Sequence, residues 1–446
     1  MSVSAVTTYP QTGRAWYMVV LLYIAYMLSF IDRTIIAYLV GPIRAAMDIS
    51  DFELSLITGF AFAVFYVTLG VPLGWLADRA NRIRIVSVCI AIWSAMTIAC
   101  GYAGSFWQLF LARIGVGIGE ASLTPTGISL ISDSFPRERR HLPINIFSAG
   151  VHGGLGISNI VGGVAVAAMG GEGARWMLNA LGGIQPWQAA FVIVGIPGIV
   201  LAVIFIFLKE PARQERQFVG HNVPFSETLK LLVEHRRIYA TLILGTSISA
   251  LASYGMYAWI PAMYERHYGW HSAEIGTYFG FITLIFGTGG LVISGYVAGR
   301  MNRAGVIASQ WKILIFALSA TTCVAPLMLA IHSPYWTLGC LCIIVFFLGT
   351  PIGLAPAAVQ AVTPNEMRAQ MTAIYIATVG ILGLGTGPST VAAMTDFVFH
   401  SDAAVGTSLS IVMTVASAVS VIVLLMGLKA FSVRLTAYEA AAAVAE

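Results

Sequence analysis

Twelve apolar segments, each long enough to cross a lipid bilayer, constrain this chain more than any other feature. A helix needs about 20 apolar residues to span the hydrocarbon core. Hydrophobic residues fill 58% of the 446 positions and charged residues only 10%, whereas about a quarter of a soluble domain is charged. We therefore expect an all-α membrane protein. The predicted spans are 15–40, 53–77, 84–103, 106–131, 141–168, 187–208, 238–262, 272–298, 306–331, 335–361, 368–394 and 404–429.

The longest polar connection divides the chain into two halves of six spans each. We predict an N-terminal six-helix bundle at 1–208, a cytoplasmic linker at 209–237 and a C-terminal six-helix bundle at 238–446. Within the linker, Ser226–Glu234 has the pattern of a short amphipathic helix. It is expected either at the membrane interface or as a solvated linker helix.

The distribution of Lys and Arg predicts the orientation. Of the 24 basic residues, 19 fall on one predicted side and three on the other, while Arg33 and Arg113 lie within spans. Basic residues concentrate in cytoplasmic loops. We expect a multi-pass protein of the cell (inner) membrane with both termini in the cytoplasm.

The two halves repeat each other in sequence. Residues 74–82 return as residues 295–303, with five of nine positions identical, and residues 136–140 return in part as 364–368. Each repeat occupies the same place in its own half. Parallel repeats related by an axis along the membrane normal are one plan of secondary transporters.

The loop after the second span resembles the signature loop of the major facilitator superfamily. Its residues are Gly74-x-Leu76-Ala77-Asp78-Arg79-x-x-Arg82-x-Arg84. Asp32-Arg33-Thr34, Gly117–Ser122 and Asp133–Arg137 also resemble the Spinster-like branch, whose animal members are implicated in moving sphingolipids and lysolipids. Anion-symporter relatives also carry an Asp-Arg pair on the first span. The resemblance implies two six-helix bundles around a central cavity.

Four charged residues lie inside predicted spans: Asp32, Arg33, Arg113 and Glu120. Each costs about 2.5–3.5 kcal/mol at the centre of a membrane helix on insertion scales, and such residues usually have a function. Arg113 and Glu120 are two helical turns apart and share a face, whereas Asp32 and Arg33 diverge by about 100°. Asp32 is therefore expected to face a helix of its own bundle and Arg33 the cavity.

Two interpretations of these charges remain open. Burial favours the neutral form of a carboxyl group and a nearby guanidinium favours the charged form, so Asp32 and Glu120 are predicted to couple proton uptake to transport. Arg33 and Arg113 would then bind the substrate or serve as charge partners, since guanidinium matches phosphate and carboxylate. The alternative is a permanent salt bridge that fixes helix packing.

Further candidates follow from the resemblance. Gly74, Asp78, Arg79 and Arg82 would form a cytoplasmic gate, although positive-inside topology alone accounts for much of this arginine cluster. Tyr26 and Tyr254 lie on the first and seventh spans, which line the cavity in the family, and would contact substrate or simply pack.

His152 in the fifth span would join a proton relay or pack by a hydrogen bond. This histidine lies in the glycine-rich stretch Gly150–Gly156. Small residues at such spacing let helices approach closely.

Several classes of function are excluded or disfavoured. No phosphate-binding loop, no paired nucleophile and base and no basic tract for nucleic acid occur, and the five cysteines lie in apolar runs. We predict a monomeric transporter, not an enzyme, with no metal or cofactor and with protons as the coupling ion. It would move an amphipathic, lipid-like organic anion by alternating access, with membrane lipids as further partners. The alternatives are an organic-acid or sugar-acid symporter, a drug efflux antiporter and, outside this class, a membrane receptor.

Overall fold

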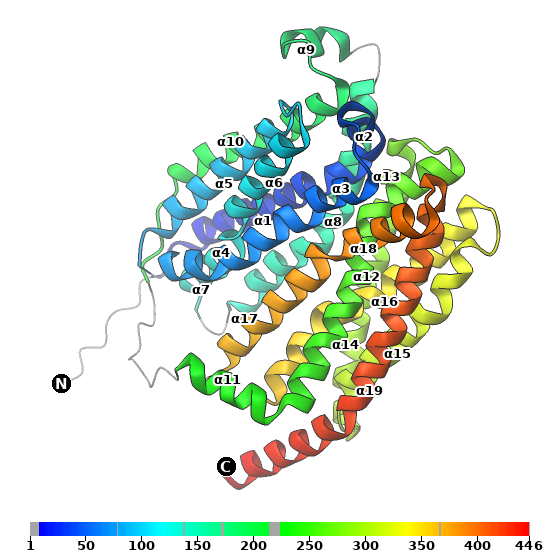
Figure 1. Cartoon of the computed structure of the whole chain (residues 1–446). Helices are drawn as coiled ribbons and strands as arrows, with labels where there is room; N and C mark the ends of the chain where they lie inside the picture. The colour runs from blue at the N-terminus through cyan, green and yellow to red at the C-terminus, as the bar shows by residue number, and fades with distance from the viewer. Residues whose placement is uncertain are drawn as a thin grey trace. The chain divides into compact units, whose positions relative to one another are not determined.

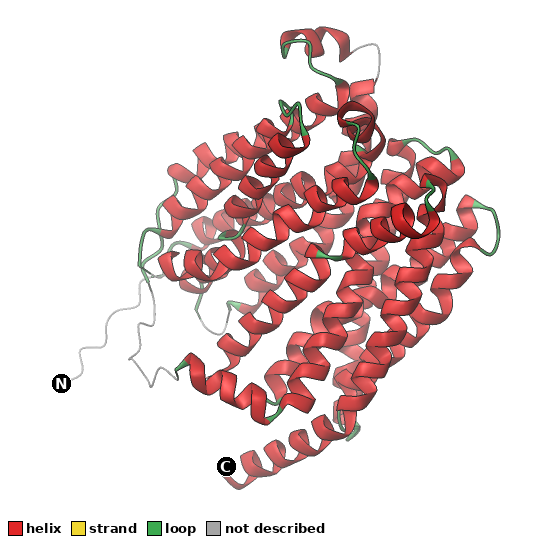
Figure 2. Cartoon of the chain, viewed as in Figure 1, coloured by secondary structure: helices red, strands yellow, loops and turns green. Residues whose placement is uncertain are grey.

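The computed structural model describes residues 9–77, 79–136, 139–170, 174–213, 224–364 and 367–445, and all regular elements in these ranges are helices (Figures 1 and 2). Eleven described helices are long and apolar enough to cross a membrane. A further apolar stretch, Gly153–Ala168, is shorter and lies within α8. The predicted all-helical membrane fold is therefore confirmed.

The chain forms two compact units. The first comprises Met1–Asp48 and Ala61–Gly220, and the second comprises Ile49–Phe60 and His221–Glu446. The helix of the second span, Asp51–Ala77, therefore contributes its first part to the second unit and the remainder to the first.

The first unit contains the helices of the first six spans, apart from the beginning of the second. Its elements are α1 (Thr12–Thr34), η1 (Ile35–Tyr38), α2 (Val40–Met47), α4 (Ala61–Ala77), α5 (Arg82–Cys100), α6 (Phe106–Glu120), α7 (Leu123–Ser134), α8 (His141–Gly170), α9 (Arg175–Ala180) and α10 (Pro186–Ile206).

The second unit contains the remaining spans. Its elements are α3 (Asp51–Ser55), η2 (Leu56–Phe60), α11 (Phe225–Glu234), α12 (Arg236–Tyr268), α13 (Ser272–Ile282), η4 (Thr283–Gly287), α14 (Thr288–Arg303), α15 (Ser309–Val324), η5 (Ala325–Leu329), α16 (Pro334–Ala361), α17 (Arg368–Val379), η7 (Gly380–Gly385), α18 (Gly387–Ala393), η8 (Met394–Phe399), η9 (Asp402–Ala404) and α19 (Val405–Ala445).

Polar residues mark the helix ends where the sequence leaves an apolar run. Ser105 accepts a hydrogen bond from the backbone N–H of Gln108 at the start of α6. Ser50 and Glu53 form a reciprocal capping box at the start of α3, which satisfies two backbone donors that a helix leaves unpaired. Gly269, with φ of 68°, ends α12 in the left-handed conformation that glycine adopts without steric cost.

Small residues bring the helices of the first unit close together. A Cβ atom built on Gly198 of α10 would lie 2.0 Å from the Ser94 hydroxyl of α5. In a membrane, where lipid tails are as apolar as leucine, such close backbone packing is a main source of helix association. A larger residue here would have to displace the Ser94 side chain, and a Cβ on Gly195 would lie 2.9 Å from the backbone oxygen of Ser94, so glycines favour the close contact between α5 and α10.

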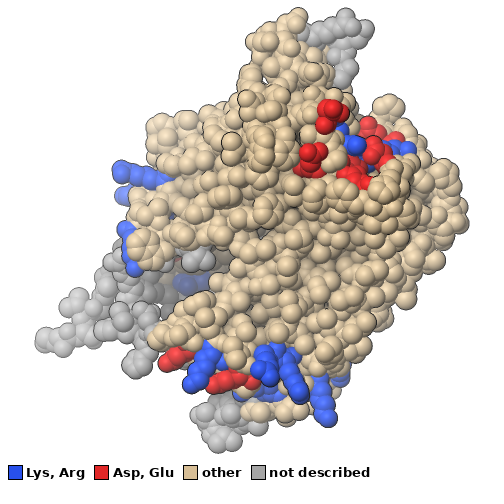
Figure 3. All heavy atoms as spheres, viewed as in Figure 1, with Lys and Arg blue, Asp and Glu red and all other residues tan. Residues whose placement is uncertain are grey.

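Charge is separated along the second unit. On the face in Figure 3, acidic side chains gather at the end beside α13, and basic side chains concentrate at the end beside α11. The apolar surface between these ends is the part expected to contact lipid.

Candidate functional site

The first unit contains a buried ion pair between α1 and α6. Nη2 of Arg33, in the last turn of α1, donates to Oε2 of Glu120, the last residue of α6, over 2.5 Å. The Glu120 side chain is 1% exposed and the Arg33 side chain 11%. The two charges therefore compensate each other away from lipid.

Aromatic rings surround the Arg33 guanidinium. Its central carbon lies 4.5 Å from the ring centre of Phe62, 5.0 Å from that of Phe30 and 5.1 Å from that of Tyr66. Aromatic faces attract a guanidinium, most strongly where water is absent. These contacts hold Arg33 toward α4 and α6.

Two glycines position Glu120. A Cβ atom on Gly117 would lie 2.6 Å from the backbone oxygen of Phe62, and one on Gly119 would lie 2.6 Å from the backbone nitrogen of Trp93. Larger residues would push α6 away from α4 and α5. The glycine-rich stretch therefore serves close packing that brings Glu120 within reach of Arg33.

Asp32 faces a different helix from its neighbour Arg33. Its carboxyl group is buried and lies beside Trp93 and Thr97 of α5. Among the described residues, Oδ1 of Asp32, Nε1 of Trp93 and Oγ1 of Thr97 make no hydrogen bond of ordinary length and angle, although these three polar groups are neighbours. As predicted from the helical angle, the two side chains diverge, and Asp32 points into its own bundle.

Arg113 completes this group of four charged residues. It is fully buried on α6, and its Nη1 donates to the backbone oxygen of Asp32 over 3.0 Å. Its Nε and Nη2 form no hydrogen bond with any residue that the structure describes. A guanidinium with vacant donors next to a buried carboxyl group can change partners when the protonation of that group changes.

The two predicted tyrosines lie in different units. Tyr26 of α1 stacks on Phe147 of α8, with ring centres 4.9 Å apart, and is half-buried. Tyr254 of α12 packs against two glycines of the second unit. A Cβ atom added to Gly383 would lie 3.1 Å from the Tyr254 side chain, and one added to Gly387 would lie 3.3 Å from it. Both tyrosines therefore have packing contacts within their own units.

The predicted gate residues have distinct surroundings. Gly74 is half-buried near Pro125. Arg79 is exposed, and the central carbon of its guanidinium lies 4.0 Å from the ring centre of Trp75. Asp78 and the side chain of His152 lie outside the described residues.

Arg82 is the centre of an ion network within the first unit. It is 1% exposed, its Nε donates to Glu210 over 2.8 Å, and its Nη1 donates to the Asp133 carboxylate and to the Ser129 hydroxyl. Sequence reasoning gave no role to Glu210 or to the Asp133 side chain. Both lie with Arg82 on the predicted cytoplasmic side, and Asp133 begins the stretch Asp133–Arg137 that resembles the Spinster-like branch, but neither signal indicated a bond to Arg82.

Residues 22–388 match the sequence profile of the Major Facilitator Superfamily. The chain belongs to this superfamily. Its members are transporters, so the protein is a membrane transporter and not an enzyme, as predicted.

Similar proteins differ in what they transport. The chain is 27% identical over 388 residues to an MFS-type efflux pump of Mycolicibacterium smegmatis, covering 86% of this chain and 85% of that protein. It is 25% identical over 382 residues to the cis,cis-muconate transport protein of Acinetobacter baylyi. This match covers 83% of this chain and 85% of that protein.

A solved structure of a Spinster homologue has the same fold as this chain. It is a bacterial homologue of the human lysosomal transporter Spinster in an inward-facing, unoccupied conformation. The TM-score is 0.79 at 24% identity, covering 96% of this chain and 98% of that one. At this identity the comparison establishes the fold.

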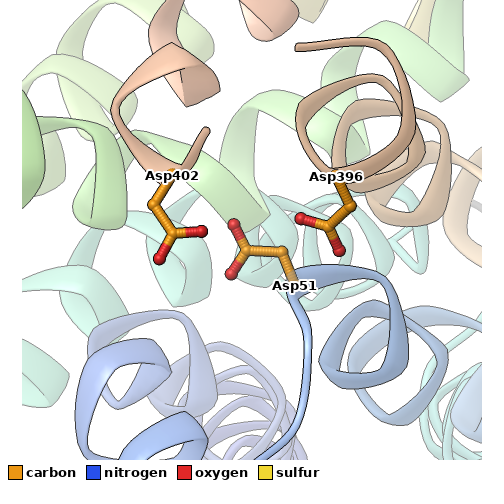
Figure 4. A group of neighbouring side chains, drawn as sticks. All are labelled: Asp51, Asp396 and Asp402. Carbon is orange, nitrogen blue, oxygen red and sulfur yellow. The ribbon is translucent and has the colours of Figure 1, made fainter. Parts of the chain in front are cut away.

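The second unit of this major facilitator contains a charge cluster that sequence analysis did not identify (Figure 4). Both carboxylate oxygens of Asp51 accept from Arg266, over 2.5 and 2.8 Å, and Asp396 accepts from the backbone N–H of Phe52 over 2.7 Å. Carboxylate oxygens of Asp51, Asp396 and Asp402 lie within 4.8 Å of one another. The guanidinium and the N-terminus of α3 supply positive charge to this acidic group.

Replacing Arg266 by Ala is expected to loosen Ile49–Phe60 from the second unit. The Asp51 side chain is fully buried, and a buried charge that loses its partner is strongly destabilising. Amide hydrogen exchange of residues 51–60 in detergent should become at least about tenfold faster. Arg266→Lys, which retains charge but not the paired geometry, should give an intermediate rate. Unchanged exchange in the alanine variant would contradict this role.

Proposed function

We propose that the protein is a proton-coupled secondary transporter that moves an amphipathic organic anion by alternating access. The observation that carries this proposal is the buried group of Asp32, Arg33, Arg113 and Glu120, in which the Glu120 carboxylate is paired with Arg33 and Asp32 forms no ion pair of this kind with a described residue. A purely structural pair would need neither Asp32 nor Arg113.

Proton binding would redistribute contacts within this group. A proton on Glu120 removes the charge that Arg33 pairs with over 2.5 Å, and the freed guanidinium then favours another anion. Arg113 already presents unpaired donors beside Asp32. One protonation event can thereby change which carboxylate or substrate anion each arginine binds.

The substrate class follows from the same side chains. Guanidinium groups match phosphate and carboxylate, and rings of Phe30, Phe62 and Tyr66 surround Arg33. This combination suits an anionic headgroup with an apolar tail. The likeness to a probable sphingolipid transporter of Arabidopsis thaliana, 26% identical over 290 residues and covering 61% of this chain and 55% of that protein, supports a lipid-like substrate.

An organic-acid substrate is the second candidate. The muconate transport protein, similar over 83% of this chain, is named for a small dicarboxylate. A short organic acid would use the arginines but not an apolar surface.

Ligand binding and transport test this proposal directly. Sphingoid and lysophospholipid anions, sugar acids, muconate and cationic drugs are added to the purified protein in detergent at two pH values, and thermal stability is measured. We expect stabilisation by the lipid-like anions that depends on pH, and their uptake into proteoliposomes driven by a pH gradient. Stabilisation by cationic drugs alone would overturn the substrate class.

We also propose that the protein acts as a monomer in the inner membrane with both termini in the cytoplasm. The 19 to 3 division of basic residues between the two predicted sides supports this orientation. Labelling of single cysteines introduced at exposed Glu53 and Glu227 in intact cells tests it. The first should react with an impermeant reagent and the second should not.

A further inference from the structure

The lateral surface of the second unit contains an apolar groove between α14, α15 and α16. Its volume is about 320 Å³. Val297 and Phe316 in its walls are 38% and 65% exposed. Six of the lining side chains are Ile293, Val297, Met301, Phe316, Phe346 and Phe347. Since these helices are membrane spans, the groove opens toward the region of lipid chains.

Positive charge lies at one end of this groove. Lys312, in the first turn of α15, is the one charged residue among those that line it. Arg300 lies three residues after Val297 in the last turn of α14, so it shares the helix face that forms the groove wall. Lys312 and Arg300 are both exposed.

No acidic residue in the neighbouring sequence compensates this charge. Between Glu274 and Glu366 the chain contains Arg300, Arg303 and Lys312 but no Asp or Glu. The described contact of Arg303 is a hydrogen bond to the backbone oxygen of Gly299. The groove therefore ends in a cationic region within the described part of this unit.

The internal repeat differs between the two halves at one arginine near this end of the groove. Arg303 is the counterpart of Arg82 at the offset of 221 residues. Arg82 is buried and bound to Asp133 and Glu210, whereas Arg303 is exposed. The arginine at this motif position is thus neutralised by protein carboxylates in one half and exposed in the other.

We propose that the groove binds an anionic phospholipid of the surrounding leaflet. One acyl chain lies along Ile293, Val297 and Met301, and the phosphate is bound by Arg300 and Lys312. Cations near a membrane surface attract anionic lipids, and the absence of Asp and Glu from the sequence of the groove walls between Glu274 and Glu366 disfavours headgroups that carry an ammonium group. This lipid is a bound component of the transporter and does not depend on the identity of the transported substrate.

Native mass spectrometry of the purified full-length protein tests the site. The probes are a diacyl phosphatidylglycerol, a phosphatidylcholine with the same chains, and glycerol phosphate without chains. We expect retention of phosphatidylglycerol in preference to both others. The double variant Arg300→Gln/Lys312→Gln should retain at least about tenfold less of it. Val297→Trp, which fills the groove from an exposed position, should also lower retention.

Arg79→Gln is the matched control, because Arg79 is the repeat counterpart of Arg300 and is likewise exposed. It should leave retention unchanged. Each variant is compared with the wild type for thermal stability without added lipid, so that misfolding is recognised. Equal retention of phosphatidylcholine, equal competition by glycerol phosphate, or full retention by the double variant or by Val297→Trp would each overturn the proposal.

Discussion

Replacing Asp32 by Asn, or Glu120 by Gln, is expected to reduce proton-driven uptake in proteoliposomes to the level of empty liposomes. Each change keeps the shape of the side chain and removes its ability to bind and release a proton. Asp32 Oδ1 makes no hydrogen bond of ordinary geometry with a described residue, so Asp32→Asn should lower thermal stability less than Glu120→Gln does. Glu120→Gln removes the partner of Arg33 and should lower stability as well, since breaking a buried pair costs about 3–5 kcal/mol.

A double variant separates coupling from packing. Arg33→Gln/Glu120→Gln removes both charges of the pair and should regain much of the stability lost by Glu120→Gln, because no uncompensated charge is left buried. Transport should not return. Glu227→Gln, at an exposed acidic residue of α11, is the control and should transport normally. Full uptake by both single variants would remove the proposed mechanism.

Replacing Arg82 by Ala is expected to destabilise the first unit by about 3 kcal/mol. The Arg82 side chain is 2% exposed, and its partners Asp133 and Glu210 are 15% and 19% exposed. Without the guanidinium these carboxylates lose the positive charge that bridges them. Thermal unfolding in detergent measures the loss.

The equivalent change at Arg79 provides the comparison. Arg79 is exposed and contacts Trp75 of its own helix, and surface substitutions usually change stability by less than about 0.5 kcal/mol. Equal effects of Arg79→Ala and Arg82→Ala would show that the ion network contributes little. If Arg82→Ala kept full stability, the role of Arg82 would be limited to setting the orientation of the chain in the membrane.

The sequence alone predicts properties that depend on local composition. The lengths of the apolar runs predict the spans, and the observed helices agree closely, with Pro334–Ala361 against the predicted 335–361 and Phe106–Ser134 against 106–131. The divergence of Asp32 and Arg33 follows from helical geometry and is observed. These features were predictable because membrane insertion depends on hydrophobicity summed along the chain.

The partners of the charges were not predictable. Arg113 and Glu120 share a face of one helix, yet Glu120 pairs with Arg33 of α1, and Arg113 donates to the backbone of Asp32. The helix positions that create these contacts depend on the close approach at Gly117 and Gly119. A glycine pattern indicates close packing without showing which helix approaches.

Contacts between distant segments were decided only by the tertiary structure. Arg266 binds Asp51 across 215 positions, and Arg82 binds Glu210 across 128. The hydrophobic pattern specifies that a helix spans the membrane, but it specifies its rotation and neighbours only weakly because most of its faces are apolar. The sequence therefore determined the membrane fold and the presence of buried charges. The packing of helices, through steric fit and charge neutralisation, determined which charges meet.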